Sequence, residues 1–192
     1  MWRVTVSTLT PRRRAVSSDP VPPIPAWLAD RPTVGGLVVP WTTPETQDGR
    51  HVFGSLHPRF RDALKRRLCG VCGNALTRPM VLLMRLSDLP LKATSEPALH
   101  PQCSRYTTLA CPMVAGRRTH YRSTPVRLDS SMTHSADTGS RLGAPAEPWF
   151  AVWLNGYDVI ELNGALAASY REIEPLRIRP INFTFSLSDL LR

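Results

Sequence analysis

The sequence predicts a small zinc-stabilised domain of the α+β class, with a β-hairpin and long Pro-rich loops. Three observations lead to this prediction. All four cysteines lie between Cys69 and Cys111, prolines are about twice as frequent as usual, and the segments with helical or strand periodicity are short and mixed. A chain of 192 residues can bury one ordinary core, whereas two independent cores would be thin.

We expect four consecutive segments. Residues 1–58 form a Pro-rich extended arm, because proline prevents regular backbone hydrogen bonding. A basic zinc-binding module follows at 59–126, and a flexible loop rich in Ser, Thr and Gly spans 127–147. Residues 148–192 form a C-terminal hairpin and helix that pack on the module.

Four segments in the first 110 residues have the pattern of a regular element. Residues 2–9 alternate and are rich in β-branched types, which predicts a short strand. Pro58–Leu68 predicts a helix, because its apolar residues recur at i, i+4 and i+8. Pro79–Leu86 is an apolar run of strand length, expected beneath the metal, and His100–Ala110 reads as a helix with proline in its first turn.

The C-terminal part carries a hairpin signal. The runs Trp149–Leu154 and Tyr157–Leu162 flank Asn155-Gly156, a dipeptide typical of two-residue hairpin turns. Residues 165–174 predict a helix that ends before a proline, and a strand is expected around 178–185.

The cysteine spacing predicts a metal site. Cys69 and Cys72 form a C-x2-C pair, and 27 residues further on His100 and Cys103 form an H-x2-C pair. Three thiolates and one imidazole complete a tetrahedral zinc site with no position left for water, so we expect structural rather than catalytic zinc.

Cys111 is the alternative fourth ligand. An unbroken helix from Cys103 to Cys111 would separate the two Cα atoms by roughly 12 Å, too far for one ion. Cys111 could therefore replace His100 only if that helix is short or broken.

The net charge of +9 is concentrated around this motif. Between Arg59 and Arg127 there are 13 Lys or Arg residues and three acidic residues. A basic field of this kind favours DNA or RNA as partner, and the expected phosphate contacts are Arg61, Lys65, Arg66, Arg117 and Arg118. Solvated arginines are the simpler interpretation of the same pattern. If the arginines are only solvated, the second hypothesis for the function applies: the chain is a protein-interaction or structural accessory module of a phage or host, with no nucleic-acid role.

The sequence contains no recognised catalytic motif, and we do not expect an enzyme. As a nucleophile and base, Cys111 and His120 would need a third residue to orient the base, and the sequence suggests none. His51 lies close to Asp48 in the sequence, but no further residues of a catalytic site accompany this pair. Cysteines confined to metal-type spacing favour a reducing compartment, so a cytoplasmic location is expected. No apolar run is long enough to span a bilayer.

The chain resembles a group of small, uncharacterised zinc-motif proteins encoded by actinobacteria and their phages. The shared pattern is an Arg-Leu-Cys-x-x-Cys-Gly-x-x-Leu element at 67–76, a Pro-x-x-His-x-x-Cys element at 97–103 and Cys-Pro at 111–112. His100 stands where the second element has its histidine. The resemblance covers roughly 58–113 and implies a shared zinc fold without implying an activity.

Overall fold

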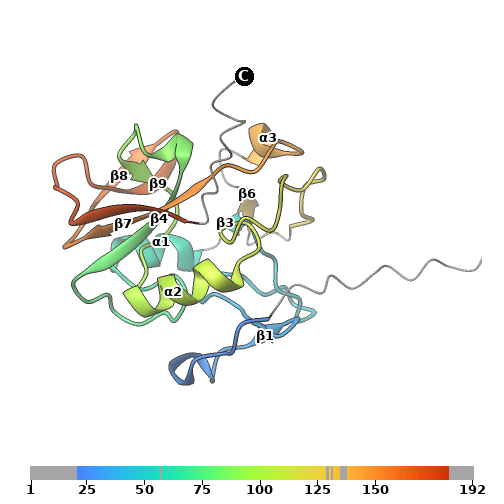
Figure 1. Cartoon of the computed structure of the whole chain (residues 1–192). Helices are drawn as coiled ribbons and strands as arrows, with labels where there is room; N and C mark the ends of the chain where they lie inside the picture. The colour runs from blue at the N-terminus through green and yellow to red at the C-terminus, as the bar shows by residue number, and fades with distance from the viewer. Residues whose placement is uncertain (1–20, 57, 129, 131, 135–137, 182–192) are drawn as a thin grey trace, which may run out of the picture.

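The computed structural model describes residues 21–56, 58–128, 130, 132–134 and 138–181 (Figure 1). It combines short helices with antiparallel sheets, so the α+β class is confirmed. The strand predicted over 2–9 and the residues after 181 lie outside the described part of the chain.

A three-stranded antiparallel sheet forms the centre of the molecule. Its order is β10-β7-β4, with bounds β4 (Met80–Arg85), β7 (Trp149–Leu154) and β10 (Arg177–Ile181). Every residue of β4 is buried. A strand covered on both faces needs apolar residues in succession rather than in alternation, and this explains the continuous apolar run Met80–Met84. The last residue of β4, Arg85, is buried with Asp88 and Glu96 as ion-pair partners. The predicted buried strand is therefore confirmed.

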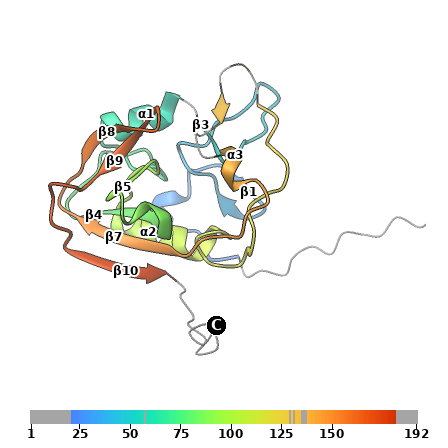
Figure 2. The same cartoon turned by 90° about the horizontal axis from the view of Figure 1, so that it is seen from above.

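Two helices cover opposite faces of this sheet. On one face, α2 (Pro101–Ala110) packs Cys103 and Tyr106 against Val81 and Leu83. On the other face, α1 (Pro58–Lys65) packs Leu64 against Leu82 and the even-numbered residues of β4. Figure 2 shows α1 beside β8 and β9, on the side away from β10, and α2 close to β4. Both helices match the expected positions, although α1 ends early because Arg67 adopts a φ of +53°.

The second three-stranded sheet corrects the predicted hairpin. Its order is β5-β9-β8, with bounds β5 (Ala93–Thr94), β8 (Asp158–Leu162) and β9 (Ala165–Ser169). The segment Trp149–Leu154 pairs with β4 and β10, and the segment after it pairs with β9 instead. A hairpin between 149–154 and 157–162 was therefore a wrong prediction.

The hairpin that the structure contains is formed by β8 and β9, and its turn is the other Asn-Gly pair in the chain, Asn163-Gly164. Asn163 and Gly164 have φ values of +53° and +77°, as a two-residue primed turn requires. Tyr157 explains why the first pair does not turn the chain back on itself. Its side chain is fully buried, and its hydroxyl donates to the carbonyl of Leu64 at 3.0 Å, so the chain leaves the central sheet toward α1.

The predicted helix over 165–174 is also wrong, because residues 165–169 form β9. Ala167 and Ala168 are buried in this strand between β5 and β8 and next to α1. Alanine favours helices, but here its small side chain lets a strand lie close to a helix, and tertiary pairing overrides the local preference.

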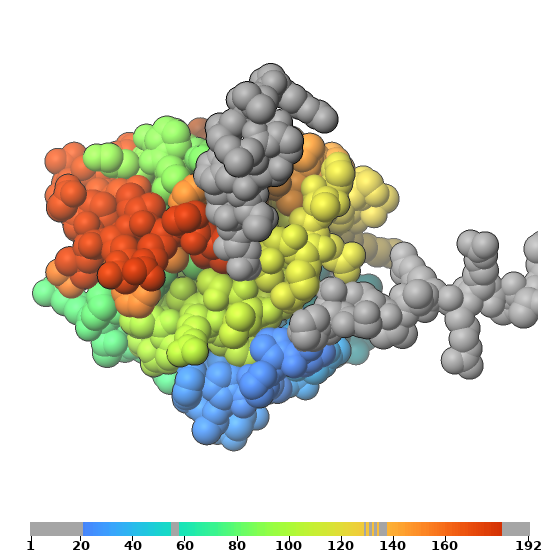
Figure 3. All heavy atoms as spheres, viewed as in Figure 1, coloured from blue at the N-terminus to red at the C-terminus, as the bar shows by residue number. Residues whose placement is uncertain are grey.

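The arm contributes to the core despite its prolines. Leu28 and Val38 are buried in the cluster that contains Cys69 and Cys103. Figure 3 shows the arm (blue) lying against α2 (yellow-green). Its elements are short: η1 (Ala26–Leu28), β1 (Thr33–Val34), β2 (Leu37–Val38) and β3 (Ser55–Leu56). The segment 127–147 carries β6 (Thr133–His134) and α3 (Thr138–Arg141), and a short helix, η2 (Leu86–Asp88), follows β4.

β1 pairs with β2, and β3 pairs with β6. The segment expected to be a loop thus carries one short strand and one helical turn. Among the described residues, no helix is long and apolar enough to cross a membrane.

Candidate metal centre

A tight turn brings the first two cysteines together. The Gly73 N–H donates to the Cys69 carbonyl, and the Cys69 N–H donates to the Asn74 carbonyl, both at 2.8 Å. Gly73 has a φ of +80°, which glycine adopts at little cost. The glycine that follows C-x2-C therefore closes a knuckle, made of residues 69–74, which points both thiols to one side.

The second pair of ligands is positioned by the start of α2. His100 is the residue that precedes the helix, Pro101 occupies its first position, and Cys103 lies in its first turn. Leu99 and Val81 exchange two backbone hydrogen bonds of 2.9 Å, which fix this segment to the edge of β4. The sheet and the helix together present His100 and Cys103 to the knuckle.

The structure brings all four predicted ligands together. One ligand atom from each of Cys69, Cys72, His100 and Cys103 lies within 4.8 Å of every other. Ligands around a tetrahedral zinc ion lie about 3.8 Å apart for Zn–S bonds near 2.3 Å, so the spacing fits. Cys72 is half-buried and the other three are buried. Such an arrangement closes around an ion and leaves no open ligand position.

A hydrogen bond sets which imidazole nitrogen can bind the metal. His100 Nε2 lies 2.9 Å from the Ala75 carbonyl, which can only accept, so Nε2 carries the proton. Nδ1 is then unprotonated, and it lies 3.5 Å from the Cys72 sulfur. This is the outer-shell contact that orients metal-bound histidines in proteins. No sequence pattern indicates this contact, because a backbone carbonyl is present at every residue.

The three thiols need a cation to ionise together. The hydrogen bond with Cys103 raises the pKa of Cys69, and the hydrogen bond with Cys69 raises the pKa of Cys72. Each neighbouring sulfur disfavours a second negative charge, and burial adds to the cost. A divalent cation reverses this balance, since thiolates rather than thiols bind metal.

Basic side chains lie beside the half-buried cysteine. The pKa of Arg31 is lowered overall, mainly by burial and next by the positive charge of Arg59. Cys72 acts in the opposite direction and offsets part of this shift. Arg31 also donates to the Val39 carbonyl at 3.1 Å. Zinc with three thiolates and a neutral imidazole carries about one negative charge, so these guanidinium groups would offset it.

The arm is fastened to the knuckle. The N–H of Trp41 donates to the Val71 carbonyl at 2.9 Å, and the N–H of Thr42 donates to the Gly70 carbonyl at 3.2 Å. The Trp41 indole packs directly on Gly73, where an added Cβ would lie 2.7 Å from its ring. A metal ion bound by the knuckle would therefore hold the arm as well as the module.

Cys111 is not part of the cluster. The helix α2 runs unbroken from 101 to 110, and Cys111 follows it as the residue that ends the helix. Burial raises the pKa of the Cys111 thiol. An unbroken helix thus separates Cys111 from Cys103, as expected from the sequence. The fourth residue of the cluster is His100 and not Cys111.

The predicted phosphate contacts are not brought together into one surface. Arg61, Lys65 and Arg66 are exposed on or just after α1. Arg118 is exposed in the segment that follows α2, the helix that packs on the opposite face of the central sheet from α1. Arg117 is partly buried there, and its guanidinium donates to the last carbonyls of α2, those of Leu109 and Ala110.

The residues weighed for catalysis have other contacts. The Asp48 carboxylate accepts a hydrogen bond from the Thr46 hydroxyl, which also lowers the pKa of Asp48. His120 is exposed, and its Nδ1 lies 3.1 Å from the Thr119 hydroxyl.

No family model, no curated protein and no solved structure matches the chain. The functional assignment therefore rests on the geometry of the described residues.

Proposed function

We propose that this chain is a structural-zinc protein that binds nucleic acid through its basic surface. The observation that carries the proposal is the closed cluster of four ligand atoms within 4.8 Å of one another. The cluster joins the knuckle, the edge of β4, the start of α2 and the arm. A single ion there would fix elements that are far apart in sequence.

Energetic magnitudes favour a structural role for the metal. Zinc binding by comparable sites is worth about 10–16 kcal/mol at neutral pH. A domain of this size is stable by about 5–15 kcal/mol. Because the metal term is as large as the whole net stability, the folded state should depend on zinc.

The exposed charges support a polyanionic partner. Among the residues from 59 to 127, all three acidic side chains are buried or partly buried. Asp88 and Glu96 are further committed to the buried Arg85. Eleven basic side chains in the same range are exposed: Arg59, Arg61, Lys65, Arg66, Arg67, Arg78, Lys92, Arg105, Arg118, Arg122 and Arg127. The field that reaches solvent is thus almost purely positive, which favours phosphate backbones.

The α1 side should contribute more to binding than the segment after α2. The exposed cations on this side are Arg59, Arg61 and Lys65 on α1, and Arg66 and Arg67 directly after it. Arg117, in contrast, already uses its guanidinium to cap α2. A row of unburied cations along a helix is the arrangement that contacts successive phosphates.

The test compares two charge-matched double variants. Lys65→Gln with Arg66→Gln removes two exposed charges beside the metal motif. Arg177→Gln with Arg179→Gln removes two exposed charges from β10, outside the basic segment. Fluorescence anisotropy with a labelled 20-base-pair duplex and a 12-nucleotide single strand would give Kd from 50 to 200 mM salt.

The wild type should show a log–log salt slope of several units, and the α1 double variant should lower that slope by one to two units. The β10 double variant should leave it nearly unchanged. Equal slopes for both variants would contradict the α1 interface, and undetectable binding of either strand type at 50 mM salt would contradict the proposed function.

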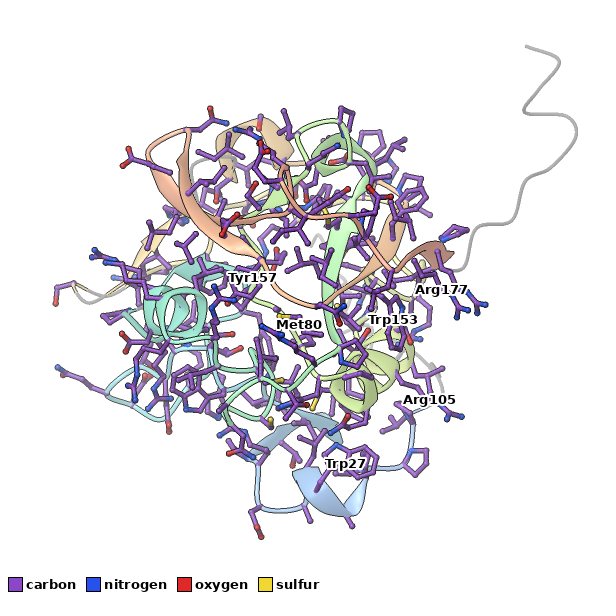
Figure 4. All side chains as sticks on the ribbon, turned by 90° about the vertical axis from the view of Figure 1, so that its left-hand side faces the viewer. Trp27, Met80, Arg105, Trp153, Tyr157 and Arg177 are labelled. Atoms are coloured by element: carbon purple, nitrogen blue, oxygen red, sulfur yellow. The ribbon has the colours of Figure 1, made fainter. Side chains whose placement is uncertain are left out.

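A second candidate function is a protein-interaction module without a nucleic-acid role. The observation that favours it is a set of apolar side chains exposed on the arm, namely Val21 and Trp27 at 55% and Val34 at 47%. Figure 4 shows Trp27 at the margin of the molecule, away from the sheet. This candidate predicts no salt-dependent binding to DNA or RNA.

A further inference from the structure

Trp41 combines an aromatic ring, an arginine and the zinc knuckle at one place. Its backbone pairs with the knuckle at Val71, and its ring rests on Gly73. The Arg59 guanidinium carbon lies 5.9 Å from the ring centroid. Arg31 is close enough for the charges of Arg59 and Cys72 to affect its pKa.

We propose that Trp41 is a stacking site for an unpaired base of single-stranded nucleic acid, with Arg59 contacting an adjoining phosphate. The inference rests on the proposed function and names the part of the nucleic acid that the knuckle takes. Single strands are bound by aromatic rings on which bases stack, combined with cations that follow the backbone.

The contact with Arg59 shows what the ring can accept. A guanidinium over an indole is a planar cation on a π face, and bases and guanidinium groups stack on such faces in the same way. Arg59 is an exposed residue at the start of α1, and its guanidinium places a positive charge beside the ring, where a phosphate that adjoins a stacked base would lie.

The knuckle holds the ring in place for this role. Trp41 is half-buried, because Gly73 supports the indole from below and two neighbouring N–H groups tie the chain to residues 70 and 71. A ring that is already immobilised loses little side-chain entropy when a base stacks on it. Lysines and arginines on a helix alone would attract duplex and single strands alike. A fixed aromatic ring adds a preference for unpaired bases.

The chain offers a matched control in Trp27. It is an exposed tryptophan of the same arm, 55% accessible, and it lies in η1 rather than on the knuckle. The comparison uses Trp41→Leu, Trp41→Phe and Trp27→Leu, each with its zinc content measured. The probes are labelled 12-nucleotide oligo(dT) and a duplex of the same length, in anisotropy titrations at 100 mM salt.

Stacking of one base is worth about 1–3 kcal/mol, which corresponds to about 5- to 150-fold in Kd. Trp41→Leu should weaken oligo(dT) binding by that factor and duplex binding much less. Trp41→Phe should recover most of the loss, and Trp27→Leu should bind like wild type. Equal oligo(dT) affinity for Trp41→Leu and Trp27→Leu would overturn the stacking site.

A measurement on the wild-type protein covers the case in which Trp41→Leu loses zinc or fails to fold. The indole N–H resonance of Trp41 can be assigned as the one that Trp41→Phe lacks. Adding oligo(dT) should shift that resonance and leave the Trp27 indole in place. An unshifted Trp41 resonance at saturating oligo(dT) would overturn the inference. Salt-dependent binding that persists in that case would leave the proposed function standing, whereas a wild type that binds no nucleic acid would overturn both.

Discussion

Trp41 lies against Gly73 so closely that a Cβ atom at residue 73 would stand 2.7 Å from the indole Cδ1 and Cγ atoms. No ordinary side chain fits at that distance, and Gly73 also has a φ of +80°. The knuckle and the arm therefore meet at a position that only glycine can occupy.

Gly73→Ala should destabilise the protein by about 3 kcal/mol, the sum of backbone strain and displacement of the indole. Gly164→Ala is the control. Gly164 has a similar φ of +77° but no atom within 4 Å of its would-be Cβ, so it should lose only about 1 kcal/mol. Urea unfolding would measure both. Equal losses would mean that the contact with Trp41 contributes nothing.

Arg85→Met should cost about 3 kcal/mol at neutral pH. Arg85 is 3% exposed and lies 3.6 Å from Asp88 and 2.9 Å from Glu96, so its removal leaves the buried Asp88 carboxylate without its cation. Glu96→Gln should cost much less, because that side chain is 36% exposed and Asp88 keeps Arg85 paired. Thermal unfolding of both variants tests this, and a loss from Glu96→Gln as large as that from Arg85→Met would refute the account.

Stability should fall between about pH 10 and pH 12 in a way that depends on Tyr157. Burial raises the pKa of Tyr157 to about 12. The folded protein therefore holds the phenolic proton more tightly than the unfolded chain does. Its contribution is fully present below the unfolded pKa near 10 and is lost as the pH rises through 12.

Tyr157→Phe should remove this pH-dependent contribution, because the variant has no phenolic proton to lose. The difference in unfolding free energy between wild type and variant should therefore narrow by about 2–3 kcal/mol as the pH rises from 10 to 12. Chemical unfolding at pH 9 and pH 11.5 provides the comparison. A gap that does not change with pH would show that the hydroxyl titrates normally in the folded protein.

Much of the central architecture could be predicted because local pattern and tertiary packing agree there. The continuous apolar run at 80–84 indicated a buried strand, and the C-x2-C and H-x2-C spacings indicated the four ligands. The hairpin could not be placed, because the chain contains two Asn-Gly pairs and the burial of Tyr157 decides between them. Residues 165–169 form a strand only because β5 and β8 pair with them.

The surroundings of the metal site were beyond prediction for a different reason. The Ala75 carbonyl, the Trp41 ring and the Arg31 side chain reach the site through the fold and not through any spacing in the sequence. Basic residues of one segment of the sequence also fall to different helices: Arg66 directly follows α1 and Arg118 lies after α2, and these helices pack on opposite faces of the central sheet.

Removal of zinc should unfold the module and release the arm. A strong chelator at neutral pH should abolish the near-ultraviolet circular dichroism signal of the tryptophans, and added zinc should restore it. Lowering the pH should release the metal as well, because protons compete for the thiolates and the imidazole. A chelated protein that melts at the wild-type temperature would contradict a structural role.

The most direct test is the metal content of three purified proteins, measured by native mass spectrometry: wild type, Cys103→Ser and Cys111→Ser. Cys103 belongs to the quartet, whereas Cys111 ends α2 outside it. We predict one zinc ion per chain in the wild type and in Cys111→Ser, and little or none in Cys103→Ser. A wild type without zinc, or a Cys111→Ser variant that loses zinc as completely as Cys103→Ser does, would contradict the account.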